Sequence, residues 1–221
     1  MIPQTQKTPS PTQTQTTRTE EPLHPLLPLV LGVPEVGPED FEVIGEGLIM
    51  VDYKTPEQCR MLIEMIEQLD ADFSYDPELP HATHDLNLIR LGLMQEADAF
   101  WSGCLNAVIA QNWPPYNDRG LHHAFALKYS YDTQKELSFH VDDSAITGTV
   151  KLNDNYTGGE LIWPRYGLSN VDIPIGKMAL FPGGITHGHY VAPLLAGSKY
   201  SLTFWSAQTS EKYEQAKQAW T

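Results

Sequence analysis

Two histidines, an aspartate and a lysine are the residues of this sequence whose types and spacing indicate chemistry. His140 and Asp142 lie two residues apart, His189 follows about fifty residues later, and Lys199 lies ten residues beyond His189. Residues i and i+2 of a strand project from the same face, so His140 and Asp142 can bind one metal ion while Val141 packs on the other side. A third ligand must then come from a neighbouring strand. Two imidazoles and one carboxylate form the facial triad that holds ferrous iron with open coordination positions, which favours catalysis over a closed structural site.

A turn is expected between the last histidine and the lysine. Pro193 and Gly197 bound a segment that would fold back as a hairpin and place the Lys199 ammonium near His189. A cation beside an open iron site suits a dicarboxylic acid, because one end of the acid can chelate the metal while the other end needs an anchor.

Other residues compete for the metal. His187 and His189 would share a strand face, so either can reach the ion, and the ten-residue interval to Lys199 favours His189. Asp143 competes with Asp142, but it would face away from the first histidine in a regular strand.

Four further residues of chemically active type are expected to have no chemical role. His122 and His123 form a pair that we expect to lie in an exposed loop without a metal. Cys59 and Cys104 fall on the apolar faces of predicted helices, where a cysteine usually acts as a small buried hydrophobe and neither as half of a disulfide nor as a nucleophile.

The motifs belong to a longer run, roughly residues 124–206, that resembles a known family. The run resembles the oxygenase domain of procollagen-lysine hydroxylases and the wider prolyl 4-hydroxylase group of iron and 2-oxoglutarate dioxygenases. The residues that carry the resemblance are Lys128-Tyr129-Ser130, Gln134, Leu137, His140, Asp142, Leu152-Asn153, Gly158-Gly159, Arg165-Tyr166, Pro182-Gly183-Gly184, Thr186-His187-Gly188-His189, Pro193, Gly197-Ser198-Lys199-Tyr200 and Phe204.

The resemblance implies a role for each matching position. Lys199 would pair with the distal carboxylate of 2-oxoglutarate, Tyr129 would donate a hydrogen bond to the same cosubstrate, and Thr149 would lie close to it. At the position of Lys199 the lysyl hydroxylases carry Arg and the prolyl 4-hydroxylases carry Lys, so the anchor here is a point charge and not a bidentate fork. The iron ligands that the resemblance implies are His140, Asp142 and His189.

The implied activity is hydroxylation of an unactivated C–H bond, most directly of a peptidyl lysine or proline, with succinate and carbon dioxide as products. Its cofactors are Fe(2+) and 2-oxoglutarate, with dioxygen as the oxidant. Whether ascorbate is also needed is left open. A free amino acid or other small molecule is the competing substrate. Two other hypotheses are a non-catalytic jelly-roll binding module and a cupin-like dioxygenase that does without 2-oxoglutarate. Trp163, Arg165 and Tyr166 would either line the substrate entrance or belong to the barrel packing.

The pattern of the chain predicts a mainly β domain with supporting helices. Thr55-Pro56-Glu57-Gln58 gives an N-cap, a proline at the first helical position and a capping box, and apolar residues at helical spacing follow it and recur from Ala97 to Ile109. We expect a double-stranded β-helix (jelly roll) with these N-terminal helices packed on one sheet. The predicted strands are 43–53, as one strand or a pair of strands, 124–131, 137–142, 146–152, 160–163, 177–181 and 199–205.

Composition bounds the remaining possibilities. The chain has 221 residues, 41% of them hydrophobic, and a formal net charge of −14. This predicts one domain over residues 41–221, preceded by a disordered or extended arm over residues 1–40 that is rich in Pro, Thr and Gln and could lay its leucines against the domain. The acidity disfavours nucleic acid as a partner and would suit a cationic or neutral substrate. Because the sequence shows no signal peptide or membrane span, a cytoplasmic location is expected, and the oligomeric state is not indicated.

The long polar segment 73–87 has two interpretations. It contains Pro77, Pro80, His81 and His84, and it could fold over the mouth of the site as a lid that grips the substrate. The alternative is an ordinary surface loop.

Overall fold

The computed structural model describes residues 26–29, 32, 36–78 and 81–220. Most of the predicted arm therefore lies outside the described residues. Leu26 and Leu27 pack against the core, as expected for leucines of the arm, and Lys54 Nζ donates a hydrogen bond of 2.9 Å to the carbonyl oxygen of Pro28. A search of the described residues for a helix with the length and apolarity of a membrane span finds none.

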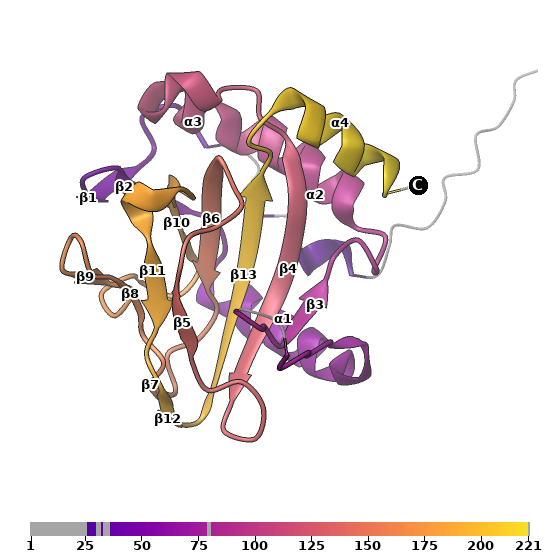
Figure 1. Ribbon diagram of the computed structural model, residues 1–221, viewed down its shortest axis with the longest axis vertical. Coiled ribbons are helices and arrows are strands. Elements are labelled where there is room, and N and C mark those ends of the chain that lie inside the picture. The colour runs from indigo at the N-terminus through magenta and orange to yellow at the C-terminus, as the bar shows by residue number, and fades with distance from the viewer. Residues whose placement is uncertain (1–25, 30–31, 33–35, 79–80, 221) are drawn as a thin grey trace, which may run out of the picture.

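Two antiparallel sheets face each other and enclose the site (Figure 1). The large sheet has the order β1-β2-β10-β6-β13-β4-β3, and the small sheet has the order β5-β11-β8-β9. The strands of the large sheet are β1 (Glu42–Gly45), β2 (Leu48–Asp52), β3 (Asp85–Asn87), β4 (Leu121–Ser130), β6 (Ile146–Lys151), β10 (Lys177–Pro182) and β13 (Ser198–Ser206). Those of the small sheet are β5 (Leu137–His140), β8 (Leu161–Trp163), β9 (Leu168–Ser169) and β11 (His189–Val191). A separate pair consists of β7 (Thr157–Gly158) and β12 (Leu194–Ala196).

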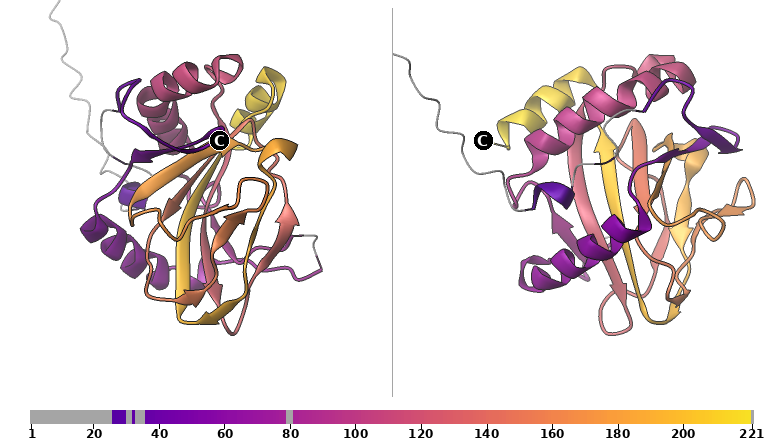
Figure 2. Two further views of the ribbon diagram at one scale, coloured as in Figure 1. Left: turned by 90° about the vertical axis from the view of Figure 1, so that its left-hand side faces the viewer. Right: turned by 180° about the vertical axis from the view of Figure 1, so that it is seen from behind.

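The helices lie on the outer face of the large sheet, which the view from behind in Figure 2 shows. Helix α1 (Pro56–Gln68) has Thr55 as its N-cap. The Thr55 side chain accepts a hydrogen bond from the amide of Gln58, and the Gln58 side chain accepts one from the amide of Thr55. Helices α2 (Met94–Phe100) and α3 (Asn106–Asn112) are joined by a π-helical turn over Trp101–Leu105, so they form one continuous helical stretch. Helix α4 (Ser210–Gln218) follows the last strand.

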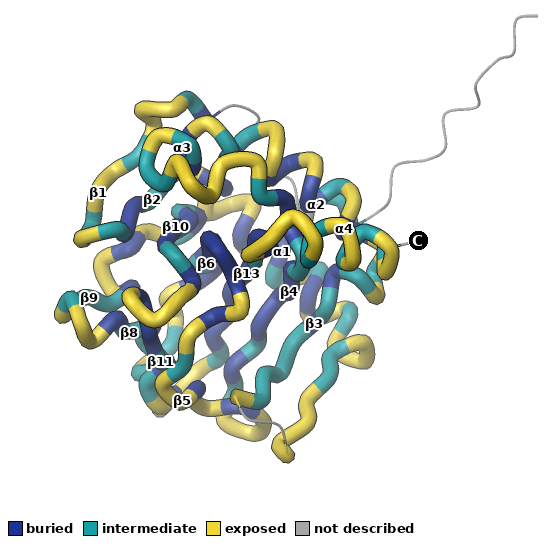
Figure 3. Tube along the Cα trace, turned by 45° about the horizontal axis from the view of Figure 1, so that its top comes forward, coloured by how far each residue is buried: buried dark blue, intermediate teal, exposed yellow. Residues whose placement is uncertain are grey.

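Strand alternation divides the interior into two apolar clusters. Leu202 and Phe204 of β13 pack with the helices, whereas Ser201 and Thr203 of the same strand face the space between the sheets. The central strands are buried along most of their length and the helices expose their outer faces, as Figure 3 shows by colour. A fully buried Leu, Ile or Phe stabilises a fold by about 1.5–3 kcal/mol, so the helical layer holds the large sheet in place behind the site.

The predicted mainly β architecture with helices packed on one sheet is confirmed. The first strand is a pair, β1 and β2, which was one of the two forms expected. The prediction missed helix α4 and the short strands β3, β7, β9, β11 and β12, because strands of two or three residues leave too few positions for a period of two to show.

Three local expectations are wrong. The turn at 193–197 does not close a hairpin, because β11 and β13 belong to different sheets and the chain crosses between them through β12 and Gly197 (φ +82°). His122 and His123 lie half-buried on β4 and not in an exposed loop. The segment 73–87 is not a free loop throughout, since it ends in β3 on the edge of the large sheet.

Cys59 and Cys104 form no disulfide within the described residues, and Cys59 is buried in the helical layer, as expected for a small hydrophobe.

The capping box of α1 yields a stability prediction. Thr55→Ala removes the side-chain oxygen that accepts the Gln58 amide, and it should lower the free energy of unfolding by about 1 kcal/mol. Urea denaturation followed by circular dichroism measures this loss. Thr55→Ser keeps the oxygen and should stay within a few tenths of a kcal/mol of the wild type. Equal stability of the Ala and Ser variants would contradict the role of the cap.

Candidate active site

Three predicted side chains converge at one end of the space between the sheets. The Nε2 atoms of His140 and His189 lie 3.6 and 3.7 Å from Oδ1 of Asp142, and one ligand atom from each residue lies within 4.8 Å of the other two. Atoms bound at about 2.1 Å to one ion, with bonds at right angles, lie about 3 Å apart, so a metal requires only a slight contraction of this arrangement. The three residues can therefore hold a metal ion.

Strand pairing brings the two histidines together across a gap of about fifty residues. β11 runs antiparallel to β5, and His189 is directly opposite His140 in the register. Their ring centroids lie 4.3 Å apart. Asp142 follows two residues after His140, where β5 has ended, and its amide donates a hydrogen bond of 2.8 Å to the carbonyl oxygen of Gly183. The small sheet thus supplies the histidines, and the turn after β5 supplies the carboxylate.

Hydrogen bonds to the backbone fix both imidazoles in the form that binds metals. Nδ1 of His140 donates to the carbonyl oxygen of Ser138 at 2.8 Å, and Nδ1 of His189 donates to that of His187 at 2.9 Å. A carbonyl oxygen can only accept, so each Nδ1 carries a proton, and Nε2 is the nitrogen whose lone pair can bind a metal in the neutral ring. Burial, and then the nearby His189, lower the pKa of His140, which favours the neutral ring that a metal requires.

The carboxylate is oriented from the large sheet. The hydroxyl of Thr147, on β6, donates a hydrogen bond of 2.7 Å to Oδ2 of Asp142. Both residues are buried. Because Oδ2 is occupied, Oδ1 is left to face the two Nε2 atoms. Thr147 was not singled out in the sequence, although alternation along the predicted strand 146–152 places it on the same face as Thr149.

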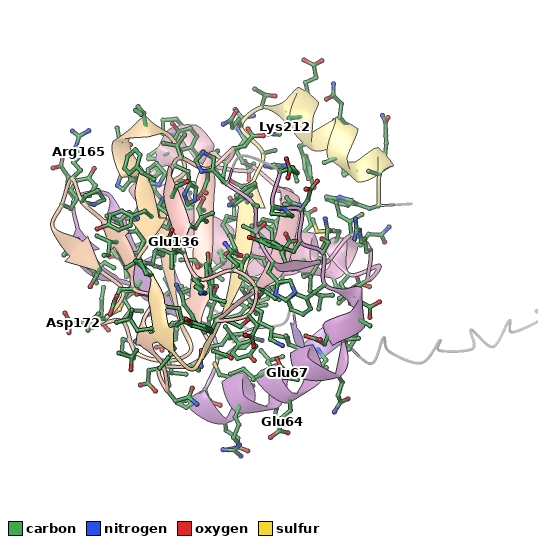
Figure 4. All side chains as sticks on the ribbon, turned by 60° about the horizontal axis from the view of Figure 1, so that its bottom comes forward. Glu64, Glu67, Glu136, Arg165, Asp172 and Lys212 are labelled. Atoms are coloured by element: carbon green, nitrogen blue, oxygen red, sulfur yellow. The ribbon has the colours of Figure 1, made fainter. Side chains whose placement is uncertain are left out.

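The competing ligands point elsewhere. His187 is buried, with Nδ1 at 2.9 Å from the hydroxyl of Thr186 and Nε2 at 3.1 Å from the carbonyl oxygen of Glu46. The side chain of Asp143 is exposed and pairs with Lys212, at the start of α4 (Figure 4). Neither belongs to the group of three that could hold an ion.

A cavity of about 320 Å³ extends from the three side chains into the space between the sheets, a size suited to a small ligand. The inner faces of β4, β6 and β13 line it with alternate residues. The predicted cosubstrate residues Tyr129, Thr149 and Lys199 all lie on this wall, together with Ser201 and Thr203.

Lys199 is buried in the cavity wall with one contact to the backbone. It is 4% exposed, its Nζ donates a hydrogen bond of 2.8 Å to the carbonyl oxygen of Gly159, and Nζ lies 4.8 Å from the centre of the Tyr129 ring. Burial lowers the pKa of Lys199 to about 7, against a raising effect of Glu160, and the positive charge of Lys151 lowers it further. An anionic ligand beside Lys199 would therefore stabilise its charged form.

Tyr129 is held as a phenol. Burial, and then the negative charge of Asp142, raise its pKa well above the ordinary value. It can therefore donate a hydrogen bond throughout the neutral range.

Lys151 lines the cavity and was not predicted from the sequence. Its Nζ donates to the carbonyl oxygens of Asn170 and Val171 at 3.3 and 3.1 Å, so it ties β6 to the turn after β9. Its position two residues beyond Thr149 on a predicted strand was a signal that could have found it.

The aromatic residues after Gly159 belong to the packing and not to the lining of the cavity. Trp163 is fully buried, and its ring lies 5.3 Å from that of Phe181 and 6.3 Å from that of His189. Tyr166 donates a hydrogen bond of 3.1 Å to the carbonyl oxygen of Thr186. Arg165 lies at the periphery of the molecule (Figure 4).

Comparisons with known proteins agree with this site. The chain is 26% identical over 159 residues to a 2-oxoglutarate and iron-dependent oxygenase domain-containing protein of Arabidopsis thaliana, which covers 64% of this chain and 40% of that protein. It is 43% identical over 86 residues to a PKHD-type hydroxylase of Pseudomonas aeruginosa, or 32% of this chain and 37% of the relative. A PKHD-type hydroxylase of Xanthomonas campestris is 27% identical over 70% of this chain and 75% of its own length. The expected resemblance is confirmed.

The sequence matches cover only part of the first relatives, and the solved structures are similar in fold. The matches to the first relatives span about two fifths of their length. No family model matches the sequence. Among solved structures, a prolyl hydroxylase of Trichoplax adhaerens in complex with a peptide fragment has a TM-score of 0.54 at 16% identity, covering 76% of this chain and 86% of that one. A Pseudomonas putida prolyl-4-hydroxylase has a TM-score of 0.51 at 16% identity, covering 74% and 94%. These two structures show that the fold is shared.

The hydrogen bond from Thr147 to Asp142 yields a prediction on metal affinity. Thr147→Val keeps the shape of the side chain and removes the donor, so the affinity for Mn²⁺ in anaerobic titration calorimetry should fall about 10- to 100-fold. Thr149→Val is the matched control, because Thr149 lies on the same face of β6. It should leave the affinity for the metal unchanged. Equal losses in the two variants would contradict an orienting role for Thr147.

Proposed function

We propose that residues 41–221 form an Fe(II)- and 2-oxoglutarate-dependent hydroxylase. The observation that carries the proposal is the convergence, in one cavity, of two imidazoles and a carboxylate with a buried lysine. The names of the curated relatives support it, since they include a 2-oxoglutarate and iron-dependent oxygenase and several PKHD-type hydroxylases.

The donor set fits ferrous iron. Two imidazole nitrogens and one carboxylate oxygen are the ligands of the mononuclear iron centres that activate dioxygen, and they leave the remaining positions free for a chelating cosubstrate. His140, Asp142 and His189 would hold the ion. The backbone acceptors at both Nδ1 atoms and the hydroxyl on Oδ2 of Asp142 orient the three donor atoms toward a common centre.

The cosubstrate anchor is the second part of the proposal. Lys199 has three N–H donors, and one of them is used by Gly159 within the described structure, so the distal carboxylate of 2-oxoglutarate can take the others. The phenol of Tyr129 lies beside this ammonium and would donate to the same carboxylate. Thr149 lies on the same wall, where it would contact the body of the cosubstrate.

With both groups bound, iron and 2-oxoglutarate supply the oxidation of an unactivated C–H bond by dioxygen, with succinate and carbon dioxide as products. The protein itself would position the iron ligands and the keto acid and exclude water from the site. Phe181 and Trp163 pack behind His189, with the Phe181 ring 5.3 Å from the imidazole, and keep that side of the site dry. Thr147 holds the carboxylate, and Lys199 fixes the direction of the keto acid.

For the substrate, we propose a peptidyl lysine or proline. The fold shared with a prolyl hydroxylase in complex with a peptide fragment and the similarity to PKHD-type hydroxylases support a peptide. A free amino acid or another small molecule is the second candidate, since the cavity is no larger than such a ligand needs. Ascorbate is an open addition to these cofactors, where it would serve to keep iron reduced.

Iron uptake and succinate formation test the proposal together. The wild-type chain should bind one equivalent of Fe²⁺ under anaerobic conditions and, with 2-oxoglutarate and air, form succinate that a substrate stimulates. His140→Ala removes one donor and should abolish both. His187→Gln is the control, because His187 faces Thr186 and Glu46, and it should retain iron uptake. A wild type without iron uptake would favour the non-catalytic binding module.

The buried lysine yields a prediction on pH. Because the charged form prevails below a pKa of about 7, the affinity of the metal-loaded protein for 2-oxoglutarate should fall as the pH rises from 6 to 9, by up to about tenfold per pH unit. Tryptophan fluorescence or calorimetry at saturating metal measures the dissociation constant. Lys199→Arg keeps its charge throughout and should flatten the profile.

Lys199→Ala should lower the affinity for 2-oxoglutarate at least tenfold at pH 6.5. Unchanged turnover of this variant would favour a cupin-like dioxygenase that uses no 2-oxoglutarate.

A further inference from the structure

The extended segment 81–85 forms a wall of the cavity that the proposed chemistry does not use. His81, Thr83 and Asp85 alternate along it, and all three line the cavity. His84 lies on the other side, with its ring 4.7 Å from that of Phe73. Thr83 and Asp85 lie two residues apart and both face the cavity, and β3 begins at Asp85.

This wall connects the edges of the two sheets beside the metal site. Asp85 pairs with Leu127 on β4, at the edge of the large sheet, and its backbone exchanges two hydrogen bonds with Ser74. At the other end, Nδ1 of His81 lies 2.9 Å from the hydroxyl of Ser138, on the edge strand β5. The His81 ring lies 5.4 Å from that of His140, so the wall ends next to the proposed iron ligand.

The conformation of His81 indicates that this attachment is specific. His81 has φ of +56°, a left-handed conformation that costs a non-glycine residue about 1 kcal/mol or more. The contact with Ser138 is part of what holds it there. The segment is therefore fixed over the cavity and does not merely pass it.

Asp85 brings a carboxylate to the cavity with one oxygen in use. Its Oδ2 accepts a hydrogen bond of 2.7 Å from the hydroxyl of Thr83. Within the described ranges, no hydrogen bond or ion pair involves Oδ1. Asp85 is half-buried, and this burial raises the pKa of its carboxyl group, against the lowering effects of the Thr83 hydrogen bond and of Arg90 and His84. A cation from a ligand would stabilise it.

We propose that Asp85 is the residue that determines substrate specificity, and that the substrate it selects carries a primary ammonium group, as a lysine side chain does. The inference rests on the proposed function and narrows its substrate. A single available oxygen suits the point charge of an ammonium better than the fork of a guanidinium, which binds a carboxylate through two oxygens. Leu127, opposite Asp85, and Phe125, two residues before it on β4, line the same wall and would pack against the alkyl stem.

The charges of the cavity support this assignment. Lys199 and Lys151 place positive charge on the wall that would hold the keto acid, and Asp85 places negative charge on the wall made by the edge strand. A cationic substrate is repelled from the first wall and attracted to the second, so it cannot occupy the anchor of the cosubstrate. A proline side chain carries no group that would use the carboxylate.

A binding experiment on the full chain loaded with Mn²⁺ and 2-oxoglutarate under anaerobic conditions tests the proposal. The probes are the Nα-acetyl methylamides of lysine, norleucine, arginine and proline, and calorimetry measures each dissociation constant. The lysine compound should bind at least about tenfold more tightly than the norleucine compound, which lacks the ammonium, and more tightly than the arginine and proline compounds. Asp85→Asn should reduce the lysine-to-norleucine ratio to within about twofold.

Two controls keep the outcome specific. Glu136→Gln removes one negative charge from an exposed residue that does not line the cavity, and it should leave the ratio unchanged. The dissociation constant of 2-oxoglutarate should be the same for Asp85→Asn and the wild type, which shows that the variant is folded and that its anchor is intact.

The results separate the two proposals. If the wild type binds Mn²⁺ and 2-oxoglutarate but prefers the proline or norleucine compound, or if Asp85→Asn keeps the preference for lysine, the role of Asp85 is overturned while the hydroxylase stands. If the wild type binds the lysine compound but not 2-oxoglutarate, the proposed function fails and Asp85 keeps its role as a cation site. No binding of the lysine compound by the wild type overturns the specificity assignment.

Discussion

The antiparallel pairing of β5 with β11 is the interaction on which the site depends. It places His189 opposite His140, and these two residues are far apart in the chain. A slip of one residue in this register would turn one imidazole to the outer face of the small sheet, because neighbouring side chains of a strand point in opposite directions. The backbone hydrogen bonds at the two Nδ1 atoms are local, since each acceptor lies two residues before its histidine on the chain, so they set the orientation of each ring while the strand pairing sets its position.

The large sheet has a different task. Its outer face is apolar and packs against α1 and the α2–α3 stretch, so the inner face is free to carry polar residues such as Thr147, Thr149 and Lys199. Burying an ammonium costs several kcal/mol unless it finds partners, and the helical layer supplies the stability that tolerates this cost. The small sheet contributes most of the metal site, and the large sheet contributes the binding wall.

The parts of the site that could be predicted are those that depend on local spacing in the sequence, and the parts that could not be predicted depend on how strands pair. His140 and Asp142 are two residues apart, and the interval from His189 to Lys199 matches a family pattern, so local spacing and resemblance were enough to bring these four residues together as candidates. Which of His187 and His189 faces the cavity depends on the turn after β10 and on the pairing with β5, and the spacing to Lys199 favoured His189 without excluding His187. Helix α4 was missed because it is strongly polar and has no buried residue.

The wall at 81–85 could not be assigned from the sequence because its role exists only through tertiary contacts. Its three cavity residues are attached to the edge of one sheet and, through Ser138, to the edge of the other. The proposed metal ligands and keto-acid anchor all lie elsewhere in the chain, at residues 140–142, 189 and 199. On the proposed assignments, the residues for reaction and those for substrate selection therefore come from separate stretches of the chain. Substitutions within residues 81–85 could therefore change the substrate during evolution, while the residues proposed to bind iron and 2-oxoglutarate stay the same.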